Sequence, residues 1–144
     1  MVDALNRIRH WLAPEGTLVD IRPAPVRVSL EVVAGDACSV AGHLADTDAE
    51  RGPSIRHTRA EEAMSTALAR GWYIVEARDA FSFLHQADTL AAMRDHVASL
   101  WKHARFDEDS WRRAEASMNS RRAAVVQLRE EVIAARLRPT VLRP

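Results

Sequence analysis

Strict alternation of apolar and polar residues marks the clearest predicted element, the segment 26–33. Its residues follow the order Val26, Arg27, Val28, Ser29, Leu30, Glu31, Val32. Successive side chains of a strand point to opposite faces of its sheet, so this pattern predicts a strand with one dry and one wet face. Gly35 and Asp36 follow as turn residues, and we expect a hairpin whose second strand covers 38–44.

Helical spacing of apolar residues appears in four other segments, 4–11, 59–70, 89–104 and 108–119. Each follows a residue that can cap a helix: Asp3, Thr58, Asp88 and Asp107. We expect Pro14 to end the first helix and Gly71 to end the second. The polar segment 45–54 is predicted to be a loop.

Two more strands are predicted at 17–22 and at 72–83, the second of them rich in aromatic and β-branched residues. In the latter, Glu76 and Arg78 are expected to form cross-strand ion pairs with Arg27 or Glu31.

The segment 123–137 fits both a helix and a strand. The helix would bury Val125, Leu128, Val132 and Ala135, whereas the strand would align Val126, Leu128, Val132 and Ala134. Periodicity alone does not decide between them. We take it as a strand, which gives an α+β fold: a mixed, mostly antiparallel sheet of four to five strands with helices packed on it.

Size and composition favour a single domain over residues 1–144, with an ordinary soluble composition. The 20 basic and 20 acidic side chains cancel, which argues against nucleic acid as a partner. No apolar run is long enough to span a membrane, and no export signal is evident at the N-terminus. Cys38 is the only cysteine, so we expect no intrachain disulfide and a cytoplasmic location.

The run 8–21, Ile-Arg-His-Trp-Leu-Ala-Pro-Glu-Gly-Thr-Leu-Val-Asp-Ile, resembles a segment of class I S-adenosylmethionine-dependent methyltransferases. In that family a helix, an LxPGG turn and the fifth sheet strand follow one another; here Glu15-Gly16 replaces Gly-Gly. The helix that ends at Gly71 and the following Trp72-Tyr-Ile-Val-Glu-Ala are similar to the family's next helix and strand. The segment 123–137 would then be its final, antiparallel strand.

The cofactor-binding half of that family has no counterpart in this sequence. Its glycine-rich loop needs neighbouring glycines, whereas the five glycines here are isolated and form no G-x-G. The resemblance therefore implies a methyltransferase-like module that binds no S-adenosylmethionine, and we expect no cofactor. A partial sheet leaves an edge and an apolar face uncovered, so we expect a homodimer or a partner protein.

Candidate chemistry is sparse. Asp20 and Arg22 end a predicted strand, where ligands gather in open α/β sheets. His57 and His85 lie next to predicted loops, whereas His96 and His103 are seven residues apart on one helix and form no H-E-x-x-H motif, so we expect no metal site. Cys38 has no basic neighbours, and we expect a buried, unreactive side chain.

Two functional hypotheses follow. The first is a non-catalytic module that acts through self-association or by binding a partner protein. The alternative is a small-molecule-binding protein or small enzyme, comparable in architecture to an NTF2-like cone. Its pocket would lie between the sheet and the helices of 89–119 and would be lined by Asp20, Arg22, His57, Trp72 and His85.

Overall fold

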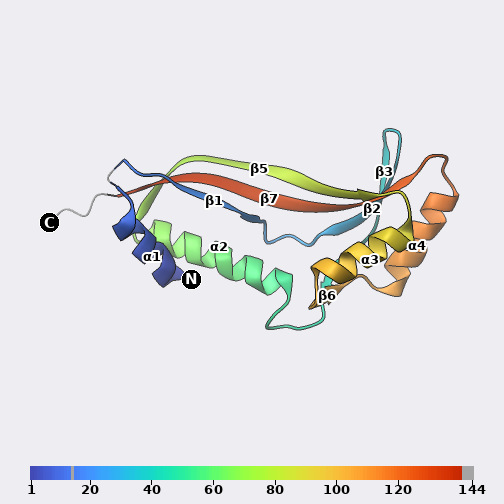
Figure 1. Cartoon of the computed structure of the whole chain (residues 1–144), viewed down its shortest axis with the longest axis horizontal. Coiled ribbons are helices and arrows are strands. Elements are labelled where there is room, and N and C mark those ends of the chain that lie inside the picture. Colours follow the sequence, from blue (N-terminus) through green and yellow to red (C-terminus); the bar gives the residue numbers. More distant parts are fainter. Residues whose placement is uncertain (14, 141–144) are drawn as a thin grey trace. The chain divides into compact units, whose positions relative to one another are not determined.

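The computed structural model describes residues 1–13 and 15–140 of the chain (Figure 1). Helices and a mostly antiparallel sheet share these residues, which confirms the predicted α+β class. The helices are α1 (Val2–Trp11), α2 (Pro53–Ala69), α3 (Leu90–Leu100) and α4 (Glu108–Asn119). The strands are β1 (Leu18–Pro23), β2 (Ser29–Ala34), β3 (Ala37–His43), β4 (Ala45–Asp46), β5 (Tyr73–Ala87), β6 (Ala104–Arg105) and β7 (Val125–Pro139).

The chain divides into two compact units. Unit 1 contains residues 1–25, 56–81 and 132–144, and unit 2 contains residues 26–55 and 82–131. The two longest strands, β5 and β7, contribute residues to both units. The ambiguous segment 123–137 falls almost wholly within the strand β7, as predicted, and β7 pairs with β1, β2 and β5 in one five-stranded sheet.

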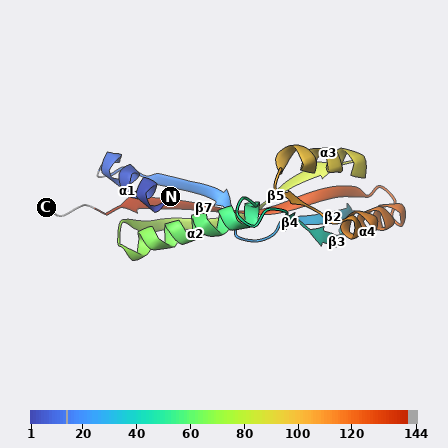
Figure 2. The ribbon, with the colours of Figure 1, turned by 90° about the horizontal axis from the view of Figure 1, so that it is seen from below.

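In unit 1, β7 lies between β1 and β5. β1 pairs with it in antiparallel register from Leu18 opposite Leu137 to Pro23 opposite Val132. Figure 1 shows α1 and α2 on one side of these strands, and Figure 2 views unit 1 from that side. The core of this unit gathers residues from the two helices and from one face of the sheet, namely Leu5, Leu12, Leu18, Met64, Ala67, Leu68, Trp72, Tyr73, Ala135 and Leu137.

The helix α1 is held mainly by its partly buried apolar side. None of its residues is fully buried. The Tyr73 hydroxyl donates a hydrogen bond of 2.6 Å to the backbone carbonyl of Leu5, which ties the helix to the first residue of β5. Burial raises the pKa of Tyr73, so the hydroxyl keeps its proton and remains a donor.

In unit 2, the strands follow the order β3, β2, β7, β5. β2 pairs with β7 from Ser29 opposite Arg129 to Val33 opposite Val125, again antiparallel. Helices α3 and α4 cover one face of this sheet. Their side chains join those of the strands in the larger core, which includes Leu30, Val32, Ala41, Met93, Val97, Phe106, Trp111, Ala114, Val126 and Leu128.

The hairpin between β2 and β3 and the end of α2 follow the sequence predictions. Gly35 lies in the turn between Ala34 and Ala37 with φ of +57°. Gly71, with φ of +65°, follows the last turn of α2. A positive φ is readily adopted by glycine, which explains both positions. Pro14, predicted to end the first helix, lies outside the described residues.

Three predicted helix starts are wrong. α1 begins at Val2, so Asp3 lies within its first turn. α3 is capped by Thr89, whose hydroxyl accepts a hydrogen bond from the amide of Ala92, and not by Asp88. Asp107 does cap α4, as predicted.

The third wrong start belongs to α2. This helix begins at Pro53, within the predicted loop, because a proline without N–H fits the first helical position; Thr58 therefore lies inside the helix. The loop also contains β4, which pairs with β6, a strand that the sequence did not predict. No helix in the described ranges is long and apolar enough to cross a membrane.

Candidate functional site

In each unit the five-stranded sheet has one face that carries no helix, which we call the open face of that unit. In unit 2 the apolar residues Leu30, Val32, Val126 and Leu128 point into the helix-covered core. Their neighbours Glu31 and Gln127 therefore point to the open face. These two residues lie opposite each other in the β2–β7 register.

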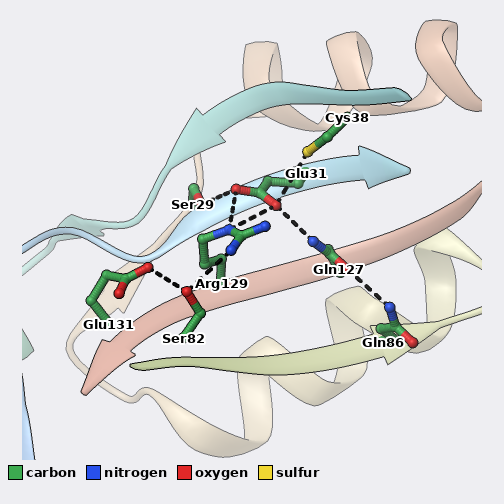
Figure 3. Close-up of polar contacts among 8 residues, drawn as sticks. All are labelled: Ser29, Glu31, Cys38, Ser82, Gln86, Gln127, Arg129 and Glu131. Carbon is green, nitrogen blue, oxygen red and sulfur yellow. Dashed lines mark hydrogen bonds and ion pairs between the residues drawn. The ribbon is translucent and has the colours of Figure 1, made fainter. Parts of the chain in front are cut away.

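Glu31 is the centre of a polar network on this open face (Figure 3). Its side chain is only 4% exposed. Arg129 donates to both carboxylate oxygens at 3.0 and 3.2 Å, and Gln127 donates at 2.7 Å. The hydroxyl of Ser29 and the thiol of Cys38 donate as well, at 2.8 and 3.4 Å.

These contacts fix the charge of Glu31. Burial disfavours the ionised form and acts to raise its pKa, but the hydrogen bonds from Arg129, Gln127, Ser29 and Cys38 outweigh burial and lower the pKa to about 2. Glu31 is thus a carboxylate at neutral pH with its donors already in place. A proton acceptor with so low a pKa is poorly matched to general base catalysis.

The predicted burial of Cys38 is wrong. The residue is exposed rather than buried. Burial of its sulfur atom and the neighbouring charge of Glu31 raise the pKa of the thiol. The thiol is protonated at neutral pH, which agrees with the expectation that Cys38 is unreactive.

The network continues onto β5. Gln86 donates to Gln127 at 3.0 Å. Ser82 accepts a hydrogen bond from Arg129 at 3.1 Å and donates one to Glu131 at 2.7 Å. Figure 3 shows this row of side chains crossing β3, β2, β7 and β5. Donors and acceptors on this face are therefore matched to one another across four strands.

The open face of unit 1 has the opposite character. Leu18, Tyr73 and Leu137 point into the core, so the alternate residues of the same strands point away from the helices. Among them Val19 is 60% exposed and Ile21 is 65% exposed. Ala134, opposite Ile21, helps to line a hollow of about 500 Å³ that also borders on Val19.

Charged side chains surround these apolar residues. Glu76 of β5 forms ion pairs with Arg136 at 3.2 Å and with Arg138 at 3.3 Å, both on β7. The predicted pairing of Glu76 and Arg78 with Arg27 or Glu31 is therefore wrong, since Arg78 lies 3.5 Å from Glu61 of α2. The open face of unit 1 combines an apolar centre with a rim that carries both signs of charge.

Asp20 and Arg22, two of the predicted ligand-binding residues, lie together on β1. Arg22 forms ion pairs with Asp20 and with Glu61 of α2. Both line a cavity of about 280 Å³, whose other walls are apolar residues of α1, β1 and α2 such as Ile8 and Met64. The Nε atom of Arg22 is buried and finds no acceptor among the described residues.

The other three predicted residues are not part of this cavity. Trp72 is stacked by the guanidinium groups of Arg9 and Arg70, at 5.3 and 5.0 Å from its ring centre. His57 is half-buried in α2. His85 belongs to unit 2, where its Nδ1 lies 3.0 Å from Nε2 of His96. The structure therefore brings together Asp20 and Arg22 but not all five residues.

Sequence reasoning missed Glu31, Gln127 and Arg129 as an interacting group. Their shared signal was visible as polar residues that alternate with valine and leucine on both strands. The sequence does not show that β2 pairs with β7. This pairing brings Glu31 next to Gln127 and Arg129, which lie 96 and 98 positions away along the chain.

Comparison of this chain with protein-family models, with curated proteins and with solved structures finds no match.

Proposed function

We propose that this protein is a non-catalytic, methyltransferase-like module that acts by self-association, with two copies meeting through the open face of unit 1. The observation that carries this proposal is the exposure of Val19 and Ile21 on one sheet face beside a hollow of about 500 Å³. Contiguous apolar surface of this kind on a folded domain is typical of an interaction site.

The same face favours a second copy as its partner. In a two-fold symmetric dimer the same surface patch of each copy contacts the other, so the patch must contain both partners of every contact. Ile21 is a projecting side chain, and the hollow at Ala134 is a recess on the neighbouring strand. Glu76 and the partly exposed Arg136 and Arg138 supply both signs of charge around this centre. An apolar centre inside a charged rim is the usual anatomy of a protein interface.

Two features support the proposed non-catalytic role and the proposed likeness to methyltransferases. The most extensive polar cluster among the described residues holds Glu31 as a carboxylate whose donors are already satisfied, which favours a structural role over a catalytic one. The antiparallel pairing of β7 with β1 is the arrangement that the methyltransferase resemblance implies for the last strand.

Sedimentation velocity over a range of protein concentrations tests the proposal, with Val19→Lys and Ile21→Lys as interface variants. Each places a charge in the apolar centre, and we expect the wild type to dimerise and both variants to be monomeric. Val40→Lys is the matched control, because Val40 is 55% exposed on the open face of unit 2, opposite Glu31.

A wild type that is monomeric at every concentration contradicts the proposal. So does a dimer that both interface variants preserve, or one that Val40→Lys disrupts equally. Circular dichroism spectra of the variants establish that each is folded, so that loss of the dimer is separated from loss of structure.

A further inference from the structure

Two histidine rings face each other in unit 2, and neither belongs to the proposed dimer interface of unit 1. His85 lies on β5 and His96 on α3, and their nearest ring nitrogens, Nδ1 of His85 and Nε2 of His96, are 3.0 Å apart. The ring of Phe83 packs edge-on against His85, with centroids 4.7 Å apart. A strand and a helix thus hold two imidazoles in a fixed mutual orientation.

A cavity of about 280 Å³ adjoins the pair. His85, His96 and the buried Met93 contribute to its wall, together with Ala87 and Ala92. The small alanine side chains leave space next to the ring nitrogens for water molecules.

Imidazole nitrogen is a preferred ligand of zinc, copper and nickel ions. Two nitrogens bound to one tetrahedral Zn²⁺, each at about 2.0–2.1 Å, lie about 3.3 Å apart. The observed separation of 3.0 Å is within a few tenths of an ångström of that value, and metal binding also requires the two rings to turn so that both lone pairs point to the ion. Without a metal ion, one of the two facing nitrogens carries a proton and donates a hydrogen bond to the nitrogen of the other ring. Metal binding requires the donor ring to change tautomer, so that its proton moves to its second nitrogen and no proton is released to solvent.

We propose that His85 and His96 form a binding site for a divalent transition-metal ion of the zinc class, with water completing the coordination shell in the adjoining cavity. Water is required because no group of three or more His, Cys, Asp or Glu side chains suited to a metal occurs in the described part of the chain. The site therefore differs from closed structural zinc sites, which have four protein ligands.

Isothermal titration of the metal-free protein with Zn²⁺ at pH 7.5 tests the proposal. We expect one equivalent to bind and His85→Gln and His96→Gln each to weaken binding by at least about tenfold, which corresponds to about 1.4 kcal/mol. His43→Gln is the control, because His43 is an exposed histidine of the same unit, and its affinity should stay within about twofold of the wild type.

A second measurement needs no variant and so does not depend on folding of the mutants. Substoichiometric Cu²⁺ broadens the NMR signals of residues near its binding site, and we expect the strongest broadening at His85 and His96. Absence of Zn²⁺ binding by the wild type overturns the proposal, as does binding that both glutamine variants retain or broadening centred elsewhere. These outcomes are independent of whether the protein dimerises.

Discussion

The open face of unit 2 satisfies its polar groups internally, whereas the open face of unit 1 leaves apolar side chains in water. Glu31 is 4% exposed and has donors on three strands, while Val19 and Ile21 are more than half exposed beside an unfilled hollow. In each unit two helices cover the other side of the same five-stranded sheet. The comparison shows that one open face pairs its polar groups internally, whereas the other leaves apolar surface free for the proposed dimer contact.

Substitutions on the two open faces should therefore have different effects. Substitutions on the open face of unit 2 should reduce folding stability, because a buried network loses partners. Substitutions on the open face of unit 1 should change association and leave folding almost unaffected.

The largest effect is expected for Glu31→Gln, which keeps the shape of the side chain and removes its charge. The new amide group faces donors from Arg129 and Gln127, so we expect unfolding to become easier by about 2–3 kcal/mol. This is less than for a fully buried ion pair, because the Arg129 side chain is 37% exposed and can be hydrated. Urea denaturation measures the change, and hydrogen exchange should locate it in unit 2.

Glu115→Gln on α4 is the matched control, since Glu115 is exposed, and its unfolding midpoint should not move. If Glu31→Gln alters stability no more than this control, the network does not stabilise the fold, and the contrast between the two open faces is lost.

Acid provides the second test of the network. The pKa of Glu31 falls from its ordinary value of 4.5 to about 2 on folding, so the folded protein binds this proton less readily than the unfolded chain. The resulting stability is complete above about pH 4.5 and is lost as pH falls through about 2, by about 3 kcal/mol in total. Free energies of unfolding between pH 5 and 2 should show this decline in the wild type, with a shallower decline in Glu31→Gln. Parallel curves for the two proteins would mean that Glu31 has an ordinary pKa.

A matched pair of valines compares burial in the two regions. Val32 is 0% exposed in the core of unit 2, and Val19 is 60% exposed on the open face of unit 1. Val32→Thr buries a hydroxyl and should cost about 1–3 kcal/mol, whereas Val19→Thr should stay within about 0.5 kcal/mol. Urea denaturation at a concentration where the protein is monomeric measures both. Equal costs would place Val19 in a core rather than on an open face.

The sequence predicted those features that depend on neighbours along the chain. Alternation in 26–33 identified β2, turn residues identified its hairpin with β3, and Asp107 marked the start of α4. The burial of Ser29 and Glu31 could not be predicted in the same way. Both occupy polar positions of an alternating strand, and only their pairing with β7 removes them from water.

The phase of β7 illustrates the same limit. The predicted strand aligned Val126, Leu128, Val132 and Ala134 on one face. In the structure Val126 and Leu128 belong to the core of unit 2, but Ala135 and Leu137 belong to the core of unit 1. The core-facing residues of β7 are thus even-numbered in unit 2 and odd-numbered in unit 1. A single alternating pattern cannot represent both. In the candidate sites, the positions of His57 and His85 next to predicted loops suggested that the two belong together, whereas the structure places His96 of α3 beside His85 of β5.

The smallest effect concerns His85 and separates the histidine pair from the Glu31 network. Burial and the nearby His96 lower the pKa of His85 in the folded protein, so the unfolded chain binds this proton more readily. Stability is then complete above the ordinary histidine pKa and declines as pH falls through it towards the lower folded value. Between pH 7.5 and 5 Glu31 stays ionised, so a decline in this range that His85→Gln reduces, and that Glu31→Gln leaves in place, belongs to the histidine pair. Stability that is constant across this range in the wild type would contradict the lowered pKa of His85.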